Sequence, residues 1–346
     1  MFHLPYVEFC ITNVCNLNCP DCNKFNNYHF SGHELWHEHA DEYEQWASKI
    51  TFDEIAIIGG EPTLNPDFIK WVNNVARLWP TSRIVIQTNG TQLDRWDELY
   101  NIMSASNGRI LIYISIHGYT LREKTYADIN NWMQGPITKT FVNGKLEDVW
   151  QQQWQCIRGE TWPESITADK FDTLLDSIKQ ECIEDYQFSP FQWENDIEKI
   201  DAQIIMLWTD SNGVRIGTVL ENSFTESAVT YQDSRLSLHD SDPEHAMNAC
   251  FMWRLHQFVD GKIYKCGPAA LLPKFTSQFP VDITDSDRKL INSYNPASVN
   301  DSDSNLGKFI NGLNNRDVIP QCKFCPSNSS RTTYEAGTKK IKIHKL

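Results

Sequence analysis

Three cysteines lie close together near the start of the chain, at Cys15, Cys19 and Cys22. Their spacing is C-x3-C-x2-C, directly after an apolar segment. Iron–sulfur clusters are normally held by four thiolates, so three thiolates would hold three irons of a four-iron cluster and leave the fourth iron open. An open position on a metal is where a substrate or cosubstrate can coordinate. The spacing therefore favours a catalytic [4Fe-4S] cluster.

Zinc is the alternative metal for this loop. A zinc site would need a fourth ligand, which Cys10, His29 or His33 could supply. The nearby His37 and His39 extend this run of histidines, which a solvated loop and helix face explain better than a metal site. The cysteine spacing alone favours iron–sulfur over zinc.

A second motif follows the next strand-like segment of the chain. Residues 54–58 run into Gly59-Gly60-Glu61-Pro62. A C-x3-C-x2-C loop after one strand, with Gly-Gly-Glu-Pro after the next, resembles the radical S-adenosylmethionine (radical SAM) superfamily. The resemblance implies that the first three cysteines hold a [4Fe-4S] cluster whose open iron binds S-adenosylmethionine. It also implies that reductive cleavage of this cosubstrate yields a 5′-deoxyadenosyl radical, which abstracts a hydrogen atom from the substrate.

The resemblance assigns further residues to the cosubstrate. Gly59, Gly60 and Glu61 correspond to the segment that contacts the methionine amino group. Glycines let the backbone approach a ligand closely, and a carboxylate accepts hydrogen bonds from an ammonium group. Strand-end positions that match contacts to the ribose or the methionine carboxylate complete the cofactor-binding set: Thr88, Asn89, Ser115 and His117.

One position departs from the family pattern. The residue before the third cysteine is often aromatic in the superfamily and lies near the adenine. Here it is Asp21, so the resemblance gives no adenine contact on that side.

Strand and helix patterns alternate through the first third of the chain. Strands are expected at 6–12, 54–58, 83–87 and 110–116, and helices at 34–50, 66–78 and 93–104. This rhythm predicts a parallel sheet with crossover helices, and ligands bind at the carboxyl ends of such strands. The cysteine loop and the Gly-Gly-Glu-Pro, Thr-Asn-Gly and Ser-Ile-His-Gly segments all fall there. We therefore predict an α/β fold, a partial (β/α)6 TIM-like barrel with a C-terminal cysteine-rich auxiliary-cluster domain.

The rhythm breaks after the fourth strand. Residues 119–165 are interpreted as an insertion over the barrel mouth, with a hairpin around 141–145, and residues 167–184 as a helix. Residues 202–208 form a fifth strand; residues 214–220 are either a sixth or its hairpin partner through the turn at 210–213. A polar linker is expected at 221–244. The predicted domains are 1–225, the barrel, and 226–346, the auxiliary domain.

Four further cysteines form a second set in the last hundred residues: Cys250, Cys266, Cys322 and Cys325. The first two flank a hairpin expected to turn at Asp260-Gly261, and the last two form C-x2-C. A structural zinc site is the simpler interpretation of four such cysteines. Their spacing resembles the short "twitch" form of the auxiliary extensions that follow radical SAM barrels, because the longer SPASM form needs more cysteines. The resemblance implies an auxiliary [4Fe-4S] cluster.

A second cluster favours a net oxidation, because it can accept an electron from the substrate radical. The alternatives are a radical epimerase or peptide maturase, in which Cys156 or Cys182 returns a hydrogen atom, and a non-catalytic iron–sulfur or zinc scaffold. The substrate is expected to be a sugar-like small molecule or a peptide, and the reductant a flavodoxin- or ferredoxin-type protein.

Charge and leader sequence restrict the partners and the compartment. The net charge of −14 over 346 residues disfavours nucleic acid or a membrane surface as the main partner. No signal peptide is recognised at the start, and ten cysteines without one suggest metal or redox chemistry in a reducing compartment. We expect a cytoplasmic protein.

Overall fold

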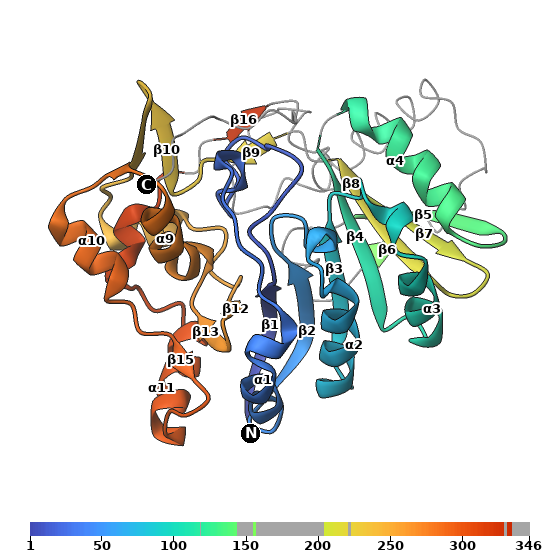
Figure 1. Ribbon diagram of the computed structural model, residues 1–346, viewed down its shortest axis with the longest axis horizontal. Coiled ribbons are helices and arrows are strands. Elements are labelled where there is room, and N and C mark those ends of the chain that lie inside the picture. The colour runs from blue at the N-terminus through green and yellow to red at the C-terminus, as the bar shows by residue number, and fades with distance from the viewer. Residues whose placement is uncertain (118, 144–154, 157–203, 221–222, 329–330, 334–346) are drawn as a thin grey trace. The chain divides into compact units, whose positions relative to one another are not determined.

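The computed structural model describes the chain except residues 118, 144–154, 157–203, 221–222, 329–330 and 334–346 (Figure 1). Two compact units are present. Unit 1 comprises the described residues of 1–86 and 224–332, and unit 2 those of 87–223 together with Thr333. In the described part of the chain, no helix is long and apolar enough to cross a membrane.

Parallel strands at the centre of unit 1 carry the predicted βα rhythm. Strand β1 (Phe2–Cys10) pairs with β2 (Ile50–Ile58), and β2 pairs with β3 (Arg83–Thr88), all in parallel. The predicted strands are confirmed, and the first two begin four residues earlier than expected. Crossover helices α1 (Ala40–Ala47) and α2 (Phe68–Leu78) connect them (Figure 1).

Both crossover helices begin later than the sequence suggested. The expected helix at 34–50 starts as a short 3-10 turn, η2 (Trp36–Glu38), before α1. Asn65 accepts a hydrogen bond from the Asp67 N–H, so the chain turns there and α2 starts at Phe68. Another 3-10 turn, η3 (Pro62–Leu64), follows the Gly-Gly-Glu segment.

The other side of β1 belongs to the C-terminal part of the chain. Strand β12 (Gln257–Val259) pairs parallel with β1 and antiparallel with β13 (Lys262–Tyr264), which pairs with β15 (Ala297–Ser298). The predicted hairpin is confirmed, since Asp260 and Gly261 have φ of 50° and 67° at its two-residue turn. Four helices complete this part of unit 1: α8 (Pro243–Ala249), α9 (Gly267–Gln278), α10 (Asp285–Asn292) and α11 (Asp303–Asn314).

The expected linker at 221–244 is wrong in its described part, because it folds into strands. Strands β10 (Val229–Gln232) and β11 (Arg235–Leu238) form a hairpin, and β11 pairs with β14 (Val281–Asp282). The inward residues Val229 and Leu236 are buried, although the segment is polar overall. Strands β9 (Ser223–Thr225) and β16 (Arg331–Thr333) form a two-stranded sheet.

Unit 2 is built on a mixed sheet. Strand β4 (Ile110–Ile116) matches its prediction and pairs parallel with β8 (Arg215–Leu220). Strand β7 (Ile204–Asp210) is antiparallel to β8 and to β5 (Ile137–Asn143), which pairs with β6 (Gln155–Cys156). The hairpin alternative for residues 214–220 is therefore confirmed. The sheet of unit 2 mixes parallel and antiparallel strands, which differs from the predicted barrel of six parallel strands.

Two helices of unit 2 lie on either side of β4. Turn η4 (Leu93–Arg95) and helix α3 (Asp97–Ala105) occupy the predicted third helix. The first residues of the expected insertion form helix α4 (Tyr119–Trp132), which was not predicted because its sequence is too polar for a clear apolar stripe. The hairpin at 141–145 lies partly, and the helix at 167–184 wholly, outside the described residues.

Candidate functional site

The cysteine trio lies at the carboxyl end of β1, as the sequence predicted. Cys15, Cys19 and Cys22 are all partly exposed. The Leu17 N–H donates to the Cys15 sulfur across 3.4 Å, and the Asn26 side-chain amide donates to the Cys22 sulfur across 3.9 Å. Hydrogen bonds to sulfur stabilise thiolates, which are the form that binds iron.

The Gly-Gly-Glu segment packs directly against the start of this loop. The Gly60 N–H donates to the Thr12 carbonyl across 2.7 Å, and the Glu61 N–H donates to the Val14 carbonyl across 2.8 Å. A Cβ on Gly60 would lie 2.3 Å from the Val14 carbonyl oxygen. Both glycines are therefore required for the backbone to pass the cysteine loop, and their predicted approach to a ligand stays a prediction.

Glu61 has a structural role that the sequence did not suggest. Its side chain is completely buried and caps η3, accepting hydrogen bonds from the Thr63 N–H at 3.2 Å and the Thr63 hydroxyl at 2.6 Å. The carboxylate is thus fixed at the end of β2. Its contact with the methionine amino group stays a prediction.

A buried ion pair supports the cysteine loop from inside the protein. Lys24 Nζ donates to Glu8 Oε2 and to Gln257 Oε1, each across 2.8 Å. Burial lowers the pKa of Lys24, but the attraction of the Glu8 and Cys10 side chains is larger in sum and raises it. The loop that follows Cys22 is therefore tied to strands β1 and β12. No sequence signal distinguished Lys24 from an exposed lysine.

Asp21, the departure from the family pattern, has an unusual backbone conformation. Its φ is 50°, a region in which Asp is tolerated and a bulky aromatic residue is strained. Burial raises the pKa of the Asp21 carboxyl, and the nearby Glu226 raises it further. This conformation gives a physical reason for a small polar residue before Cys22.

The second cysteine set converges in unit 1. Cys250 ends α8, Cys266 precedes α9, and Cys322 and Cys325 lie on and beside the turn η6 (Pro320–Phe324). Burial raises the pKa of Cys325 well above its ordinary value, and the charges of the other three thiolates raise it further. Burial likewise raises the pKa of Cys266 to about 12. These raised pKa values keep the buried thiols protonated in the absence of metal, and a metal centre would deprotonate the thiols and neutralise their charge.

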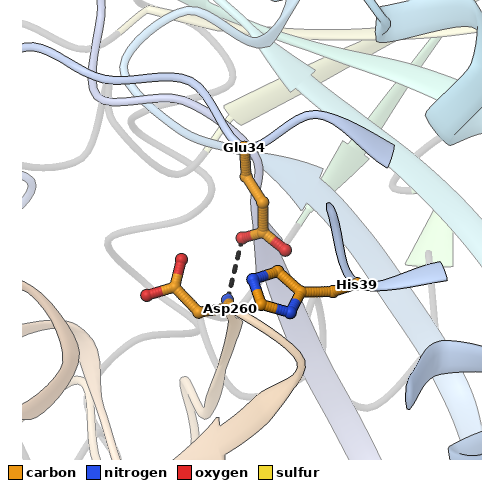
Figure 2. A group of neighbouring side chains, drawn as sticks. All are labelled: Glu34, His39 and Asp260. Atoms are coloured by element: carbon orange, nitrogen blue, oxygen red, sulfur yellow. Dashed lines mark hydrogen bonds between the residues drawn. The ribbon is translucent and has the colours of Figure 1, made fainter. Parts of the chain in front are cut away.

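The distances between possible ligand atoms can be compared with those of a zinc site. Tetrahedral zinc would hold its sulfur ligands about 3.8 Å apart. Among the described residues, the one group with three ligand atoms within 4.8 Å of one another is Glu34, His39 and Asp260 (Figure 2). Neither cysteine set is that compact. Both cysteine sets suit an iron–sulfur cluster by donor chemistry.

The group in Figure 2 already has partners within the protein. Glu34 accepts a hydrogen bond from the Asp260 N–H across 2.9 Å, and Tyr43 donates its hydroxyl to the same carboxylate. Lys274 pairs with Asp260 across 2.7 Å. Burial raises the pKa of Glu34 to about 7. We interpret the group as a clamp on the turn between β12 and β13, which carries Cys266 a few residues later.

The remaining predicted cofactor contacts belong to unit 2. Asn89 accepts hydrogen bonds from the Thr91 N–H at 3.0 Å and the Thr91 hydroxyl at 2.6 Å, while Thr88 accepts one from the Gly90 N–H at 3.1 Å. Gly90 has a φ of 74°, and a Cβ there would lie 2.7 Å from the Ile114 side chain. The Thr-Asn-Gly turn therefore packs on β4.

Strand β4 carries two more of these predicted contacts. Ser115 is half-buried on the strand, and His117 follows its end. Burial lowers the pKa of His117 to about 4, so its ring is neutral at pH 7. Their contacts with the cosubstrate stay predictions.

The two cysteines proposed as hydrogen donors remain predictions. Cys156 lies on β6, where only its backbone is described. Cys182 lies outside the described residues.

Comparison with known proteins supports the first motif. Residues 9–140 match the family model described as the Radical SAM superfamily. These residues form a radical SAM superfamily domain. The domain contains the cysteine trio, the Gly-Gly-Glu segment and the two later strand-end segments, Thr-Asn-Gly and Ser-Ile-His-Gly. The superfamily uses a [4Fe-4S] cluster and S-adenosylmethionine, so the resemblance is confirmed at this level.

The curated relatives share one name. The chain is 24% identical over 164 residues to GTP 3′,8-cyclase of Actinobacillus pleuropneumoniae serotype 3, covering 46% of this chain and 38% of that protein. It is 31% identical over 109 residues to the probable GTP 3′,8-cyclase of Thermoplasma volcanium, covering 32% of each. The matches thus span about a third of the relatives' length.

Solved structures add little. Native anSMEcpe with bound AdoMet and Cp18Cys peptide is 21% identical and covers 38% of this chain and 40% of its own. Its TM-score of 0.29 is too low to support a conclusion.

Proposed function

We propose that this protein is a radical SAM oxidoreductase with two iron–sulfur clusters. In this proposal Cys15, Cys19 and Cys22 hold the cluster that binds S-adenosylmethionine. Cys250, Cys266, Cys322 and Cys325 hold an auxiliary [4Fe-4S] cluster of the twitch type. The net reaction is the dehydrogenation of a sugar-like small molecule or a peptide.

The convergence of the last four cysteines supports this proposal most strongly. The charges of Cys250, Cys266 and Cys322 each raise the pKa of Cys325, although Cys250 and Cys325 are far apart in the sequence. Three thiolates leave one iron open for the cosubstrate, whereas four complete the ligand set. A complete set suits electron transfer rather than substrate binding.

The electrons balance for an oxidation. The bound cluster and cosubstrate together supply a 5′-deoxyadenosyl radical, at the cost of one electron from a flavodoxin- or ferredoxin-type reductant. A dehydrogenation would remove one hydrogen atom, one further electron and one proton from the substrate, and the cluster that Cys250, Cys266, Cys322 and Cys325 would hold could supply the electron acceptor. An alcohol substrate would be converted into a carbonyl compound. The protein holds both sets of thiolates and excludes water around the buried Glu61 end of β2.

A nucleotide reaction is the second candidate, because the curated relatives carry the name GTP 3′,8-cyclase. Their low identity and partial coverage leave the substrate of this chain open to test. The epimerase alternative requires Cys156 or Cys182 as a hydrogen donor.

A substrate panel separates these reactions. Anaerobically reconstituted protein would be incubated with S-adenosylmethionine, dithionite and, separately, nucleotide sugars, aminocyclitols, cysteine-containing peptides and GTP. We expect one 5′-deoxyadenosine per product molecule that has lost two hydrogens. Turnover of GTP and of no other compound in the panel would support the activity for which the relatives are named. An epimerase would instead give a product with the composition of the substrate and one deuterium atom taken up from deuterated solvent. Loss of this incorporation in Cys156→Ala or Cys182→Ala would support the epimerase.

A further inference from the structure

Lys265 is a buried cation with an unusual environment. It lies between the end of β13 and Cys266, and only 3% of its surface is exposed. Its Nζ has no hydrogen-bond partner among the described residues. An unpaired ammonium is costly to bury, so a protein that keeps one usually places it against negative charge.

The backbone of Lys265 is fixed on both sides. Its N–H donates to the Tyr294 hydroxyl across 2.9 Å, and its carbonyl accepts a hydrogen bond from His256 Nδ1 across 2.8 Å. Burial lowers the pKa of His256 to about 4, so the ring is neutral at pH 7 and donates through Nδ1. Tyr294 stacks on Tyr264, with ring centroids 5.9 Å apart. These contacts hold the lysine in one position on the hairpin.

Thiolates bound to a metal centre in the cysteine set would supply this negative charge, because Lys265 directly precedes Cys266 in the chain. The Lys265 side chain interacts electrostatically with Cys250, Cys266 and Cys322. Arg316 also acts on Cys250, but it donates to the Met247 carbonyl across 2.7 Å and therefore has a partner of its own.

We propose that Lys265 is the counter-cation of the C-terminal four-cysteine site and raises the reduction potential of the cluster held there. This inference rests on the proposed auxiliary cluster. Four thiolates give a [4Fe-4S] cluster a net negative charge, and reduction adds one more. A fixed cation in a site of low dielectric constant stabilises the reduced state more than the oxidised state. The cluster then accepts an electron from the substrate more readily.

Lys323 provides a matched control. It is adjacent to Cys322, as Lys265 is adjacent to Cys266. Its Nζ, however, pairs with Asp240 and Asp287, each across 2.9 Å, so its charge is already compensated. Removing Lys323 should therefore change the cluster potential much less than removing Lys265.

The test isolates the C-terminal cluster and titrates it. A Cys15/Cys19/Cys22→Ala protein would be reconstituted with iron and sulfide, and its midpoint potential measured by EPR during stepwise reduction. We expect Lys265→Met to move the midpoint to a more negative potential, Lys265→Arg to retain most of the wild-type value, and Lys323→Met to leave it unchanged. Equal midpoints for Lys265→Met and Lys323→Met would overturn the inference while leaving the cluster in place. Absence of any cluster in the triple-alanine parent would instead contradict the proposed function.

Thermal unfolding gives a second readout that does not depend on a potential. Without metal, Lys265→Met should unfold at a higher temperature than its parent, because an unpaired buried charge has been removed. With the cluster bound, that advantage should disappear or reverse. A lower unfolding temperature for metal-free Lys265→Met would mean that the lysine has a different partner, and would count against the inference.

Discussion

Lys24 donates a hydrogen bond to Glu8 across 2.8 Å, and both side chains are almost fully buried. Gln257 of β12 completes this contact by accepting a second hydrogen bond from Lys24. Residues from the cysteine loop, the first strand and the C-terminal hairpin therefore meet inside unit 1. The two cysteine sets are carried by segments that share this one polar contact.

Replacing Lys24 should destabilise the protein strongly. Lys24→Met leaves the Glu8 carboxylate buried without its cation, a change that typically costs about 3–5 kcal/mol. Urea unfolding measures the loss. Arg77→Met is the control, because Arg77 pairs with Glu44 on the surface, where both side chains are about half exposed, and it should cost less than about 1 kcal/mol. Equal effects of the two substitutions would contradict the supporting role of Lys24.

Adding one methyl group at Gly60 should disturb the cysteine loop. Gly60→Ala places a Cβ 2.3 Å from the Val14 carbonyl oxygen, so the contact between β2 and the loop must open. We expect about 1–3 kcal/mol of destabilisation and less iron after reconstitution. Gly307→Ala in α11 is the control, because its Cβ would meet only Phe2 at 3.5 Å and alanine favours a helix. Normal iron content in Gly60→Ala would argue against this contact.

Glu34 should make stability depend on pH. Burial raises its pKa from 4.5 to about 7, so the folded protein binds this proton more tightly than the unfolded chain. The resulting stabilisation is complete below pH 4.5 and is lost as the pH rises through 7. Relative to Glu34→Gln, the wild type should lose about 3 kcal/mol across this range.

Urea unfolding at several pH values between 5 and 8 measures this difference. Glu44→Gln, at a half-exposed surface position, is the control for general effects of removing a carboxylate. A difference between wild type and Glu34→Gln that stays constant with pH would contradict the raised pKa.

The sequence predicted well what depends on local pattern. The apolar segments before Cys15 and Gly59 are true strands, and the Asp260-Gly261 turn has the positive φ values that a two-residue hairpin needs. The position of Cys15, Cys19 and Cys22 on a loop after the first strand followed from these elements, whereas helices α8 and α9, which have Cys250 and Cys266 at their ends, were not predicted.

Features that depend on contacts between distant residues could not be predicted from the local sequence pattern. Helix α4 is polar, and its position depends on the strand β4 that precedes it, so the sequence pattern did not reveal it. Lys24 and Lys265 are buried through partners or charges distant in sequence, which no local spacing reveals. The approach of Gly59 and Gly60 to a ligand stays a prediction, whereas their close contact with the backbone at Thr12 and Val14 was not predicted.

The central claim is that Cys15, Cys19 and Cys22 hold a cluster that cleaves S-adenosylmethionine. The most direct measurement is 5′-deoxyadenosine formation by anaerobically reconstituted protein with dithionite, comparing the wild type with the Cys15/Cys19/Cys22→Ala variant. We predict 5′-deoxyadenosine from the wild type and none from the variant, whose C-terminal cysteines are intact. Equal amounts from both proteins, or none from a wild type that contains its iron, would contradict the account.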